Sequence, residues 1–485
     1  MKPFATNLSH KTIPPLDLPT KLGYGVGELS KEIPTSILVF FLLFFLTDTV
    51  GLSPGLAGSI LLVGKMWDAI NDPLIGWLSD STQSFRGRRF PWMLWAAVPL
   101  GISFWLLWMI PPFNNQWQLF LYYTGVLILY YTALTSIAIP HATLAAELTQ
   151  TYDERTQLVS YKSAFGIGSS ILGLFIAQAV FATVDNVGLR FGLLGGIAGV
   201  IMIISVYGCV LVTSKRFWLL QNQRVQVKSV TQHSIRQQLW MVIRLRPFLY
   251  LMGVYFCSWI ALQATAAILP FYVVSWMQLP EQHFTQVLLT VQGTALLAIL
   301  FWNPFGQLIG KRAAFCCGIP LTITAQIGLF LLKPDQILWM YLLGVLAGIG
   351  LSTAYLAPWS MLPDVIDLDE LQTGKRREGF FCGLMVQLQK LGTALSIFMV
   401  GKVLDWSGYI NSGINYDTEL TQPASALTAI RWLLGPLPAL VLLVGICCAI
   451  KYPITRDFHD AILLKLRSVR KDRSVAQSLI DQNTQ

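Results

Sequence analysis

Long apolar runs, each about the length that crosses a lipid bilayer, recur along almost the whole chain. A bilayer core about 30 Å thick is spanned by about 20 helical residues, so each run predicts a transmembrane helix. The pattern predicts twelve of them, at 22–48, 54–80, 91–111, 117–148, 156–184, 191–213, 247–277, 284–310, 314–332, 336–370, 377–402 and 424–452. We therefore predict an all-α polytopic membrane protein.

The composition agrees with this interpretation and argues against a soluble protein. Of the 485 residues, 54% are hydrophobic and only 12% are charged, whereas soluble domains carry about 25% charged residues. The seven cysteines lie in apolar runs without a CxxC or Cys/His spacing, so we predict no disulfide, no zinc site and no cofactor. Neither an HExxH motif nor a P-loop is present, and an enzyme is not predicted.

The formal charge of +9 would suggest a nucleic-acid partner in a soluble protein. Here the basic residues gather in the loops that would share one side of the bundle: Arg86, Arg88, Arg89, Arg155, Lys311, Arg312 and 375–377. The positive-inside rule accounts for this asymmetry, so we predict no nucleic-acid partner. The same rule predicts a multi-pass protein of the cell (inner or plasma) membrane with both termini in the cytoplasm.

The spans divide the chain into five segments. They are a cytoplasmic N-terminal segment (1–21), a six-helix bundle (22–213), a basic central loop (214–246), a second six-helix bundle (247–452) and a cytoplasmic tail (453–485). The central loop has no acidic residue. It fits a contact with anionic lipid, a regulatory site, or a solvated linker with an amphipathic helix along the membrane.

The two halves of the chain carry matching motifs. Asn71-Asp72-Pro73 near the end of the second helix corresponds to Asn303-Pro304 in the eighth, and Pro140…Glu147 in the fourth corresponds to Pro358…Asp364 in the tenth. Two six-helix repeats around a central site are a common plan of transporters. A channel or a receptor has no need of this duplication.

Charged residues inside the second predicted helix point to an ion site. Lys65, Asp68, Asn71 and Asp72 are spaced three and four residues apart and share one helix face. A charge at mid-bilayer costs about 3 kcal/mol, so such acids indicate function. Two carboxylates and an amide oxygen suit Na⁺, although two adjacent carboxylates also hold a proton readily. The alternative is a structural Lys65–Asp68 ion pair.

Three further charges lie where a membrane makes them costly. Lys390 in the eleventh helix needs a counter-charge, and Asp68 and Asp72 are the acids that we expect to supply it. The alternative is that Lys390 reaches backbone carbonyls. Near the start of the first helix, the pair Lys31-Glu32 provides a candidate acceptor for substrate, or an interfacial ion pair.

Four short motifs are the most specific stretches of the chain: Lys21-Leu22-Gly23-Tyr24-Gly25, Trp67-Asp68-Ala69-Ile70-Asn71-Asp72-Pro73, Tyr152-Asp153-Glu154-Arg155-Thr156 and Leu362-Pro363-Asp364-Val365-Ile366-Asp367. Together they resemble the glycoside–pentoside–hexuronide:cation symporter family, the melibiose-permease group of the major facilitator superfamily. The resemblance covers nearly the whole chain and is also seen with the animal lysolipid symporters.

The resemblance implies roles for single residues. It implies a cation site, for Na⁺ if Na⁺ is used, made of Asp68, Asn71, Asp72 and Thr135. The implied substrate contacts are Lys31, Glu32, Lys162 and Lys390. The segment from Gly76 to Arg89 is similar to the superfamily's gating loop, and the implied gating residues are Asp80, Arg86, Arg155, Asp364 and Asp367.

The chain departs from melibiose permease where that protein holds its sugar. A helix-4 Asp and a nearby Trp are replaced by Ala138 and Ala142, and a helix-5 Arg by Ser163, next to Lys162. Galactosides are therefore not expected. We predict a Na⁺- or H⁺-coupled symporter that moves a glycoside-like or other small organic solute by alternating access. A lysolipid-like amphiphile as solute and an uncoupled facilitator or exporter are the alternatives.

Overall fold

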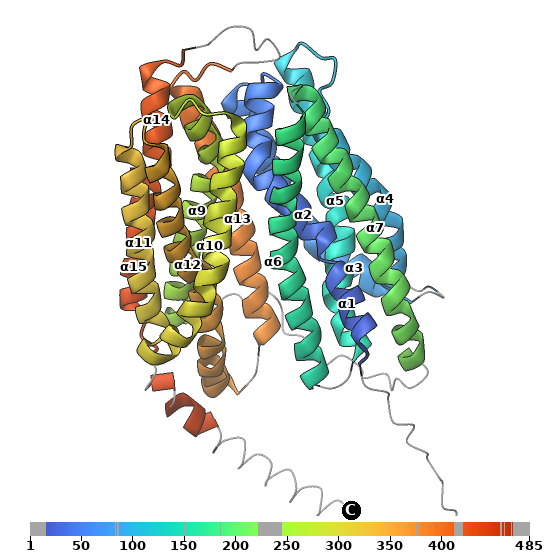
Figure 1. Ribbon diagram of the computed structural model, residues 1–485. Coiled ribbons are helices and arrows are strands. Elements are labelled where there is room, and N and C mark those ends of the chain that lie inside the picture. The colour runs from blue at the N-terminus through green and yellow to red at the C-terminus, as the bar shows by residue number, and fades with distance from the viewer. Residues whose placement is uncertain are drawn as a thin grey trace, which may run out of the picture.

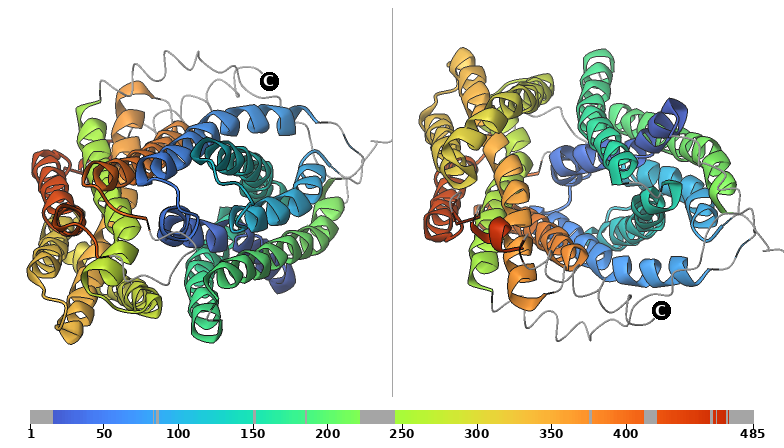
Figure 2. Two further views of the ribbon diagram at one scale, coloured as in Figure 1. Left: turned by 90° about the horizontal axis from the view of Figure 1, so that it is seen from above. Right: turned by 90° about the horizontal axis from the view of Figure 1, so that it is seen from below.

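The computed structural model describes residues 16–468 except 83, 85–86, 150–151, 185, 222–244, 375–376, 412–420, 456–457, 460 and 467. The described residues are helical apart from short turns, as the sequence predicts. The helices form two groups that lie side by side (Figure 1) and can be told apart when viewed along the helices (Figure 2).

The first group, the N-terminal bundle, contains six crossings. Its first crossing is a broken helix of α1, α2 and two π-helical turns, η1 and η2. The bounds are α1 Leu18–Val26, α2 Leu29–Ile37, η1 Leu38–Leu42, η2 Phe45–Thr49, α3 Pro54–Ser81, α4 Phe90–Leu107, α5 Gln116–Leu148, α6 Tyr152–Thr183 and α7 Val187–Gln221.

The second group, the C-terminal bundle, has the same number of crossings. Its first crossing ends in a π-helical turn, η3, and its last is divided at Gly435. The bounds are α9 Arg246–Phe271, η3 Tyr272–Trp276, α10 Glu281–Ile309, α11 Lys311–Leu331, α12 Ile337–Thr373, α13 Glu378–Trp406, α14 Ala424–Leu434 and α15 Pro436–Lys451.

Within the described residues, ten helical segments are long and apolar enough to span a membrane. The other two crossings are the broken first one and α3. The first crossing is divided between α1 and α2 and again at its π-helical turns, so that each of its α-helices has only nine residues. Helix α3 carries the charged stripe around Asp68. Together they complete the predicted two bundles of six helices.

One predicted boundary is too early. Helix α7 continues to Gln221, so Lys215 and Arg216 belong to a helix and not to the basic central loop. Arg216 is buried, and its guanidinium lies 3.9 Å from the Glu154 carboxylate and 3.4 Å from the Leu148 carbonyl. The helix extends because these partners at the ends of α5 and α6 neutralise the charge. The central loop from 222 to 244 lies outside the described residues.

The bundles contact each other through α3 with α13, α6 with α10, and η1 with α9. The α3–α13 contact depends on glycine. A Cβ on Gly401 would lie 2.5 Å from the Pro54 carbonyl oxygen and 3.1 Å from the Cα of Gly58. The two backbones therefore approach each other more closely than any side chain would allow.

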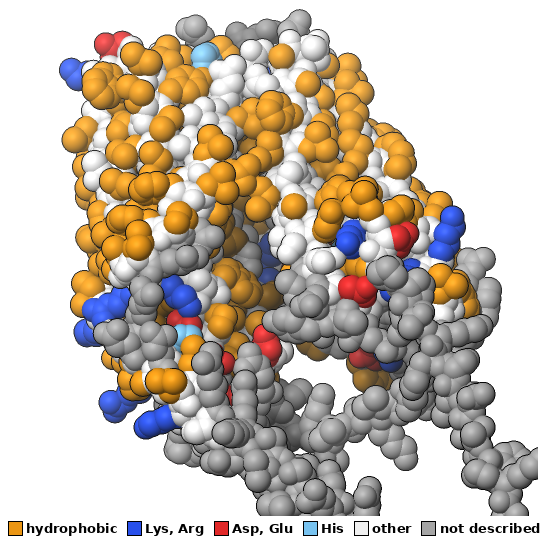
Figure 3. All heavy atoms as spheres, turned by 60° about the horizontal axis from the view of Figure 1, so that its bottom comes forward, with side chains coloured by type: hydrophobic (Ala, Val, Ile, Leu, Met, Phe, Trp, Pro, Cys, Tyr) orange, Lys and Arg blue, Asp and Glu red, His pale blue; other side chains and the backbone are white. Residues whose placement is uncertain are grey.

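The two ends of the molecule differ. We call the end that carries the start of α1 and the end of α15 the terminal face, and the other end the opposite face (Figure 1). With the terminal face turned toward the viewer, the surface is hollowed between the two bundles (Figure 3). At the opposite face, hydrogen bonds and an ion pair join the bundles.

Candidate functional site

The predicted cation residues meet between the bundles. Asp68 and Asp72 of α3, here called the α3 acid pair, lie beside Lys390 of α13. The Lys390 Nζ is 2.6 Å from Asp72 Oδ2 and 3.0 Å from Asp68 Oδ2. The pairing of Lys390 with both acids is confirmed, and the alternative that it reaches backbone carbonyls is not needed.

Thr135 of α5 lies on the other side of the same carboxylates. Its Oγ1 is 3.3 Å from Asp68 Oδ1 and 3.3 Å from Asp72 Oδ1. A hydroxyl donates one hydrogen at a time, so it can satisfy only one of these oxygens. Three oxygens thus converge opposite the ammonium. This is a set of hard donors that suits an alkali cation.

Asn71 and Lys65 complete the surroundings. Asn71 is buried, and its Nδ2 has no hydrogen-bond partner among the described residues. Lys65 Nζ lies 3.7 Å from Asp68 Oδ2 and 4.6 Å from the centre of the Tyr131 ring. The Lys65–Asp68 pair therefore exists, but it does not replace the contact of Lys390 with Asp72. Two lysines balance two acids, so an entering cation would have to displace an ammonium.

The other predicted substrate residues form a second group in the N-terminal bundle. Lys31 is 2.9 Å from Glu32, and both Lys31 (3.5 Å) and Lys162 (3.4 Å) approach the carboxylate of Glu28. His141 Nδ1 is 3.4 Å from the same carboxylate. We call these five residues the Glu28 cluster. Lys390 does not belong to it and lies with the α3 acid pair.

Glu28 and His141 were missed by the sequence analysis. Glu28 precedes Lys31 and Glu32 by three and four residues, a spacing that places all three on one helix face. That spacing was a usable signal. His141 gave none, because a lone histidine after Pro140 does not reveal which helix it faces.

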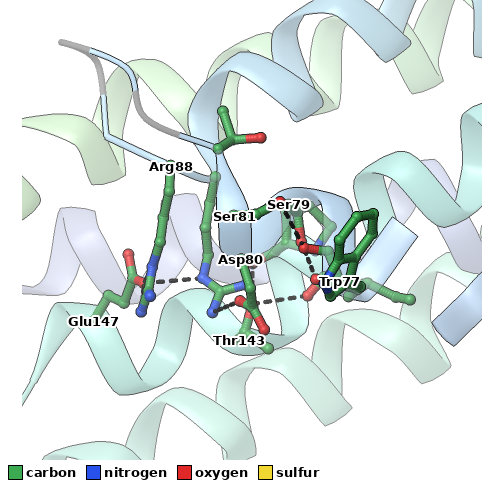
Figure 4. A network of polar contacts seen from close by, with 12 residues as sticks. Trp77, Ser79, Asp80, Ser81, Arg88, Thr143 and Glu147 are labelled. Atoms are coloured by element: carbon green, nitrogen blue, oxygen red, sulfur yellow. Dashed lines mark hydrogen bonds and ion pairs between the residues drawn. The ribbon is translucent and has the colours of Figure 1, made fainter. Parts of the chain in front are cut away.

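The predicted gating residues form ion pairs at the terminal face. Arg89 NH2 is 3.0 Å from Asp80 Oδ1, and its Nε is 2.9 Å from Glu147 Oε1. Arg88 also contacts Glu147, at 2.9 Å (Figure 4). Asp80 thus pairs with Arg89, three positions after the predicted Arg86. Arg86 itself lies outside the described residues. The side chain of Arg155 also lies outside them.

The C-terminal bundle repeats this arrangement. Lys311 Nζ is 2.7 Å from Asp364 Oδ1, and His459 Nε2 is 3.4 Å from Asp364 and 3.2 Å from Asp367. Thus the first residue of α11, just after α10, pairs with α12 as the loop after α3 pairs with α5. The matching motifs of the two halves therefore correspond to matching ion pairs, and each pair stays within its own bundle.

The opposite face is held together by contacts across the bundles, which the sequence analysis did not predict. Arg190 of α7 forms an ion pair of 2.6 Å with Glu281 of α10, and both side chains are nearly buried. The Tyr409 hydroxyl donates to Asp48 at 2.8 Å. Asn411 Nδ2 donates to the carbonyls of Gly51 and Leu52, each at 3.0 Å. We call these contacts the opposite-face latch.

A mostly apolar cavity of about 90 Å³ lies in the C-terminal bundle. Val39 and Phe40 of the first crossing line it from the N-terminal bundle. Its wall also carries buried oxygens of Gln263, Thr322 and Gln326 that have no hydrogen-bond partner among the described residues. The cavity therefore combines an apolar wall with a few acceptors.

Comparison with known proteins agrees with this architecture. The chain is 39% identical to an uncharacterized symporter of Synechocystis sp. (95% of this chain, 98% of the relative). It is 27% identical to the sodium-dependent lysophosphatidylcholine symporter 1 of Gallus gallus (94% and 90%). The fold resembles a bacterial homologue of the iron transporter ferroportin, solved in an inward-facing state, with a TM-score of 0.63 at 14% identity (90% and 97%).

The match to a family extends from residue 23 to residue 456, almost the whole of the two bundles. That family is described as MFS/sugar transport protein, MFS being the major facilitator superfamily. The fold, the duplicated ion pairs and the symporter relatives agree with it. The chain belongs to the MFS/sugar transport protein family and is a secondary transporter, not an enzyme.

Proposed function

We propose that this transporter is a Na⁺-coupled symporter of a small organic solute. The observation that carries the proposal is the Lys390 ammonium bound by Asp68 and Asp72, with Thr135 on the far side of the same carboxylates. An ammonium in this position acts as a built-in stand-in for a monovalent cation. We propose that Na⁺ takes its place during transport.

Na⁺ would bind to the carboxylates of the α3 acid pair, with Thr135 Oγ1 and the side-chain amide oxygen of Asn71 as further ligands. It would neutralise the acids and release Lys390, which belongs to the other bundle. Because Lys390 links α13 to α3, its release removes a contact between the bundles and permits them to rock. Reciprocal linkage requires that a solute which favours the same arrangement also tightens Na⁺ binding.

The choice of Na⁺ over H⁺ rests on two arguments. A threonine hydroxyl midway between two carboxylates provides a third oxygen ligand, which a cation uses and a proton does not need. Relatives of this chain are named sodium-dependent symporters. H⁺ coupling, in which one of the α3 acids carries the proton, is the alternative.

For the solute, we propose an amphiphile with a charged head group. Lys31, Glu32 and Lys162 would contact the head, and the apolar cavity would receive the tail. The relatives include a lysophosphatidylcholine symporter and a sphingosine-1-phosphate transporter. A glycoside, in keeping with the resemblance to the melibiose-permease group, is the second candidate, because Gln263, Thr322 and Gln326 offer acceptors to sugar hydroxyls.

We also propose that the terminal face is cytoplasmic, so that both termini lie inside the cell. The support is the gathering of basic residues at that face, of which Arg88, Arg89 and Lys311 are among the described ones. A single cysteine at the exposed Leu18, in a variant without the seven native cysteines, should resist an impermeant thiol reagent added to intact cells. Labelling from outside would refute the orientation.

Uptake into reconstituted vesicles tests the coupling and the solute together. Lysophosphatidylcholine and a glucoside serve as probes, and Na⁺ and pH gradients are imposed separately. We expect Na⁺-driven accumulation of the lysolipid that Asp68→Asn and Asp72→Asn each abolish, because each removes a charge that Na⁺ needs. Asp335→Asn, at an exposed turn, is the matched control. Accumulation that persists in either site variant would refute that residue's role.

A further inference from the structure

His141 is a buried histidine whose two ring nitrogens both face hydrogen-bond acceptors. Its Nε2 lies 2.9 Å from the main-chain carbonyl oxygen of Tyr24. Its Nδ1 lies 3.4 Å from a carboxylate oxygen of Glu28. Carbonyl and carboxylate oxygens can only accept, so both contacts are favourable only when both nitrogens carry hydrogen. The geometry therefore favours the imidazolium form of His141.

The position of His141 is unusual because it spans the break in the first crossing. Helix α1 ends at Val26 and α2 begins at Leu29. At the break, the Glu28 N–H donates to the Gly25 carbonyl in a tight turn, and His141 of α5 bonds the Tyr24 carbonyl just before it. One side chain thus holds the backbone on one side of the break and a carboxylate on the other.

The surroundings pack closely against the His141 ring. A Cβ on Gly27 would lie 2.5 Å from His141 Nε2 and 3.0 Å from the Cys209 sulfur of α7. The Tyr24 ring stacks on the imidazole at 4.5 Å between centroids. The glycine at the break is therefore required for the close approach of His141.

The charges facing this pair come from three elements. Glu28, Lys31 and Glu32 belong to the first crossing, Lys162 to α6, and Cys209 of α7 adds a thiol. Two acids and two lysines balance, so a proton on His141 sets the net charge of the cluster. The side chain of Lys31 is 42% exposed, so the edge of the cluster opens to the surroundings of the protein, which gives the proton a route for exchange.

We propose that His141 and Glu28 form a proton-binding site, separate from the α3 acid pair, that fixes the break between α1 and α2 when His141 is protonated. Without the proton, a nitrogen lone pair faces either the carboxylate or the carbonyl, and one of the two contacts becomes repulsive. The start of α2 is then released. Since α2 carries Lys31 and Glu32, the proton controls the position of these two charges.

The protonation state is measurable on the purified protein, without knowledge of the solute. Nitrogen NMR of histidine-labelled protein distinguishes an imidazolium from a neutral ring, and His141→Gln assigns the signal among the five histidines of the chain. Spectra are recorded from about pH 6 to about pH 9, a range that brackets ordinary histidine titration. We expect an imidazolium that persists to a higher pH in the wild type than in Glu28→Gln.

A neutral ring at about pH 6, or the same titration in Glu28→Gln, would overturn the proposal. Thermal unfolding supplies a second readout. A proton held by the folded state stabilises it at low pH, and this contribution is lost as the pH rises. His141→Gln should therefore flatten the decline of the melting temperature with pH. His283→Gln is the control, because His283 contacts the Tyr341 hydroxyl, which can donate or accept. Equal slopes in wild type and His141→Gln would refute the role.

Both readouts are independent of Na⁺-driven uptake. If uptake fails to need Na⁺ while His141 still titrates as expected, the proposed coupling is wrong and the proton site stands. If His141 does not titrate while uptake depends on Na⁺, only the proton site is lost.

Discussion

Replacing Lys390 with alanine tests the claim that this lysine occupies the place of the coupling cation. The lysine lies 2.6 Å from Asp72 and 3.0 Å from Asp68. At an effective dielectric constant of about 20, each contact has a gross attraction of about 6 kcal/mol. Desolvation of the buried charges consumes most of it. Removing one partner of such a group lowers the free energy of unfolding by about 3–5 kcal/mol, largely because the other charges are left unpaired.

The expected result depends on the buffer. In cation-free buffer, Lys390→Ala should lower the free energy of unfolding by an amount in that range. In saturating Na⁺ the loss should be smaller, because Na⁺ neutralises the acids that the lysine has left. The variant should also bind Na⁺ more tightly than the wild type, since the ion no longer competes with an ammonium. The exposed Lys451→Ala, at the end of α15, is the control.

A double-mutant cycle locates the partner. Asp72→Asn or Asp68→Asn, added to Lys390→Ala, should restore part of the lost stability through a coupling of about 0.5–3 kcal/mol. The assay is denaturant unfolding of the purified protein in detergent, with choline replacing Na⁺ in the cation-free arm. Two results would refute the idea that Lys390 takes the place of the coupling cation: stability losses that are additive with both acids, or an equal loss of stability in the two buffers. Lys390 would then be left to serve the substrate.

Two further predictions concern the contacts between the bundles. Arg190→Gln removes the ion pair of the opposite-face latch, so a cysteine replacing the buried Thr49 should react faster with an impermeant thiol reagent from that face. Arg431→Gln, whose contacts stay within the C-terminal bundle, should leave the rate unchanged, and equal rates in both variants would contradict the latch. Gly401→Ala should destabilise the protein by about 1–3 kcal/mol because its Cβ overlaps the backbone of α3. Gly383→Ala on the same helix has nothing within 4 Å of its Cβ and should not destabilise the protein. Equal melting temperatures of the Gly401→Ala and Gly383→Ala variants would contradict the close crossing.

The fold could be predicted from the sequence because a membrane imposes length and polarity on each helix separately. Twelve apolar runs and a duplicated motif are local signals, and they led to two bundles of six helices. Helix ends were harder to predict. Arg216 looked like a loop residue by its charge, but its partners Glu154 and Leu148 are distant in sequence and only the fold brings them near.

Part of the candidate site could also be predicted, because its signal is local in the sequence. Lys65, Asp68 and Asp72 share a helix face, which the spacing reveals. The contact with Lys390 could be inferred because a lone buried ammonium needs an acid. Arg190 and Glu281 gave no such signal, because charges near helix ends are ordinary at a membrane surface. Their pairing depends on the angle between the bundles, which no local pattern encodes.

The distribution of ion pairs fits the proposed rocking of the two bundles. At the terminal face, Arg89 pairs with Glu147 and Lys311 with Asp364, each within one bundle. Rocking of rigid bundles leaves such pairs intact. At the opposite face, Arg190 and Glu281 come from different bundles and must separate when that face opens. Both ions would then gain water, and their hydration would offset part of the lost attraction.

The contact of Lys390 with the α3 acid pair lies in the same α3–α13 interface as the close crossing of Gly58 and Gly401. In the proposed mechanism, an ion that releases Lys390 would remove the charged contact while the glycine crossing still holds the helices together. The bundles would then pivot on the crossing without separating. A cation site placed away from this interface would bind Na⁺ without changing how the bundles are joined, and binding would not be coupled to movement.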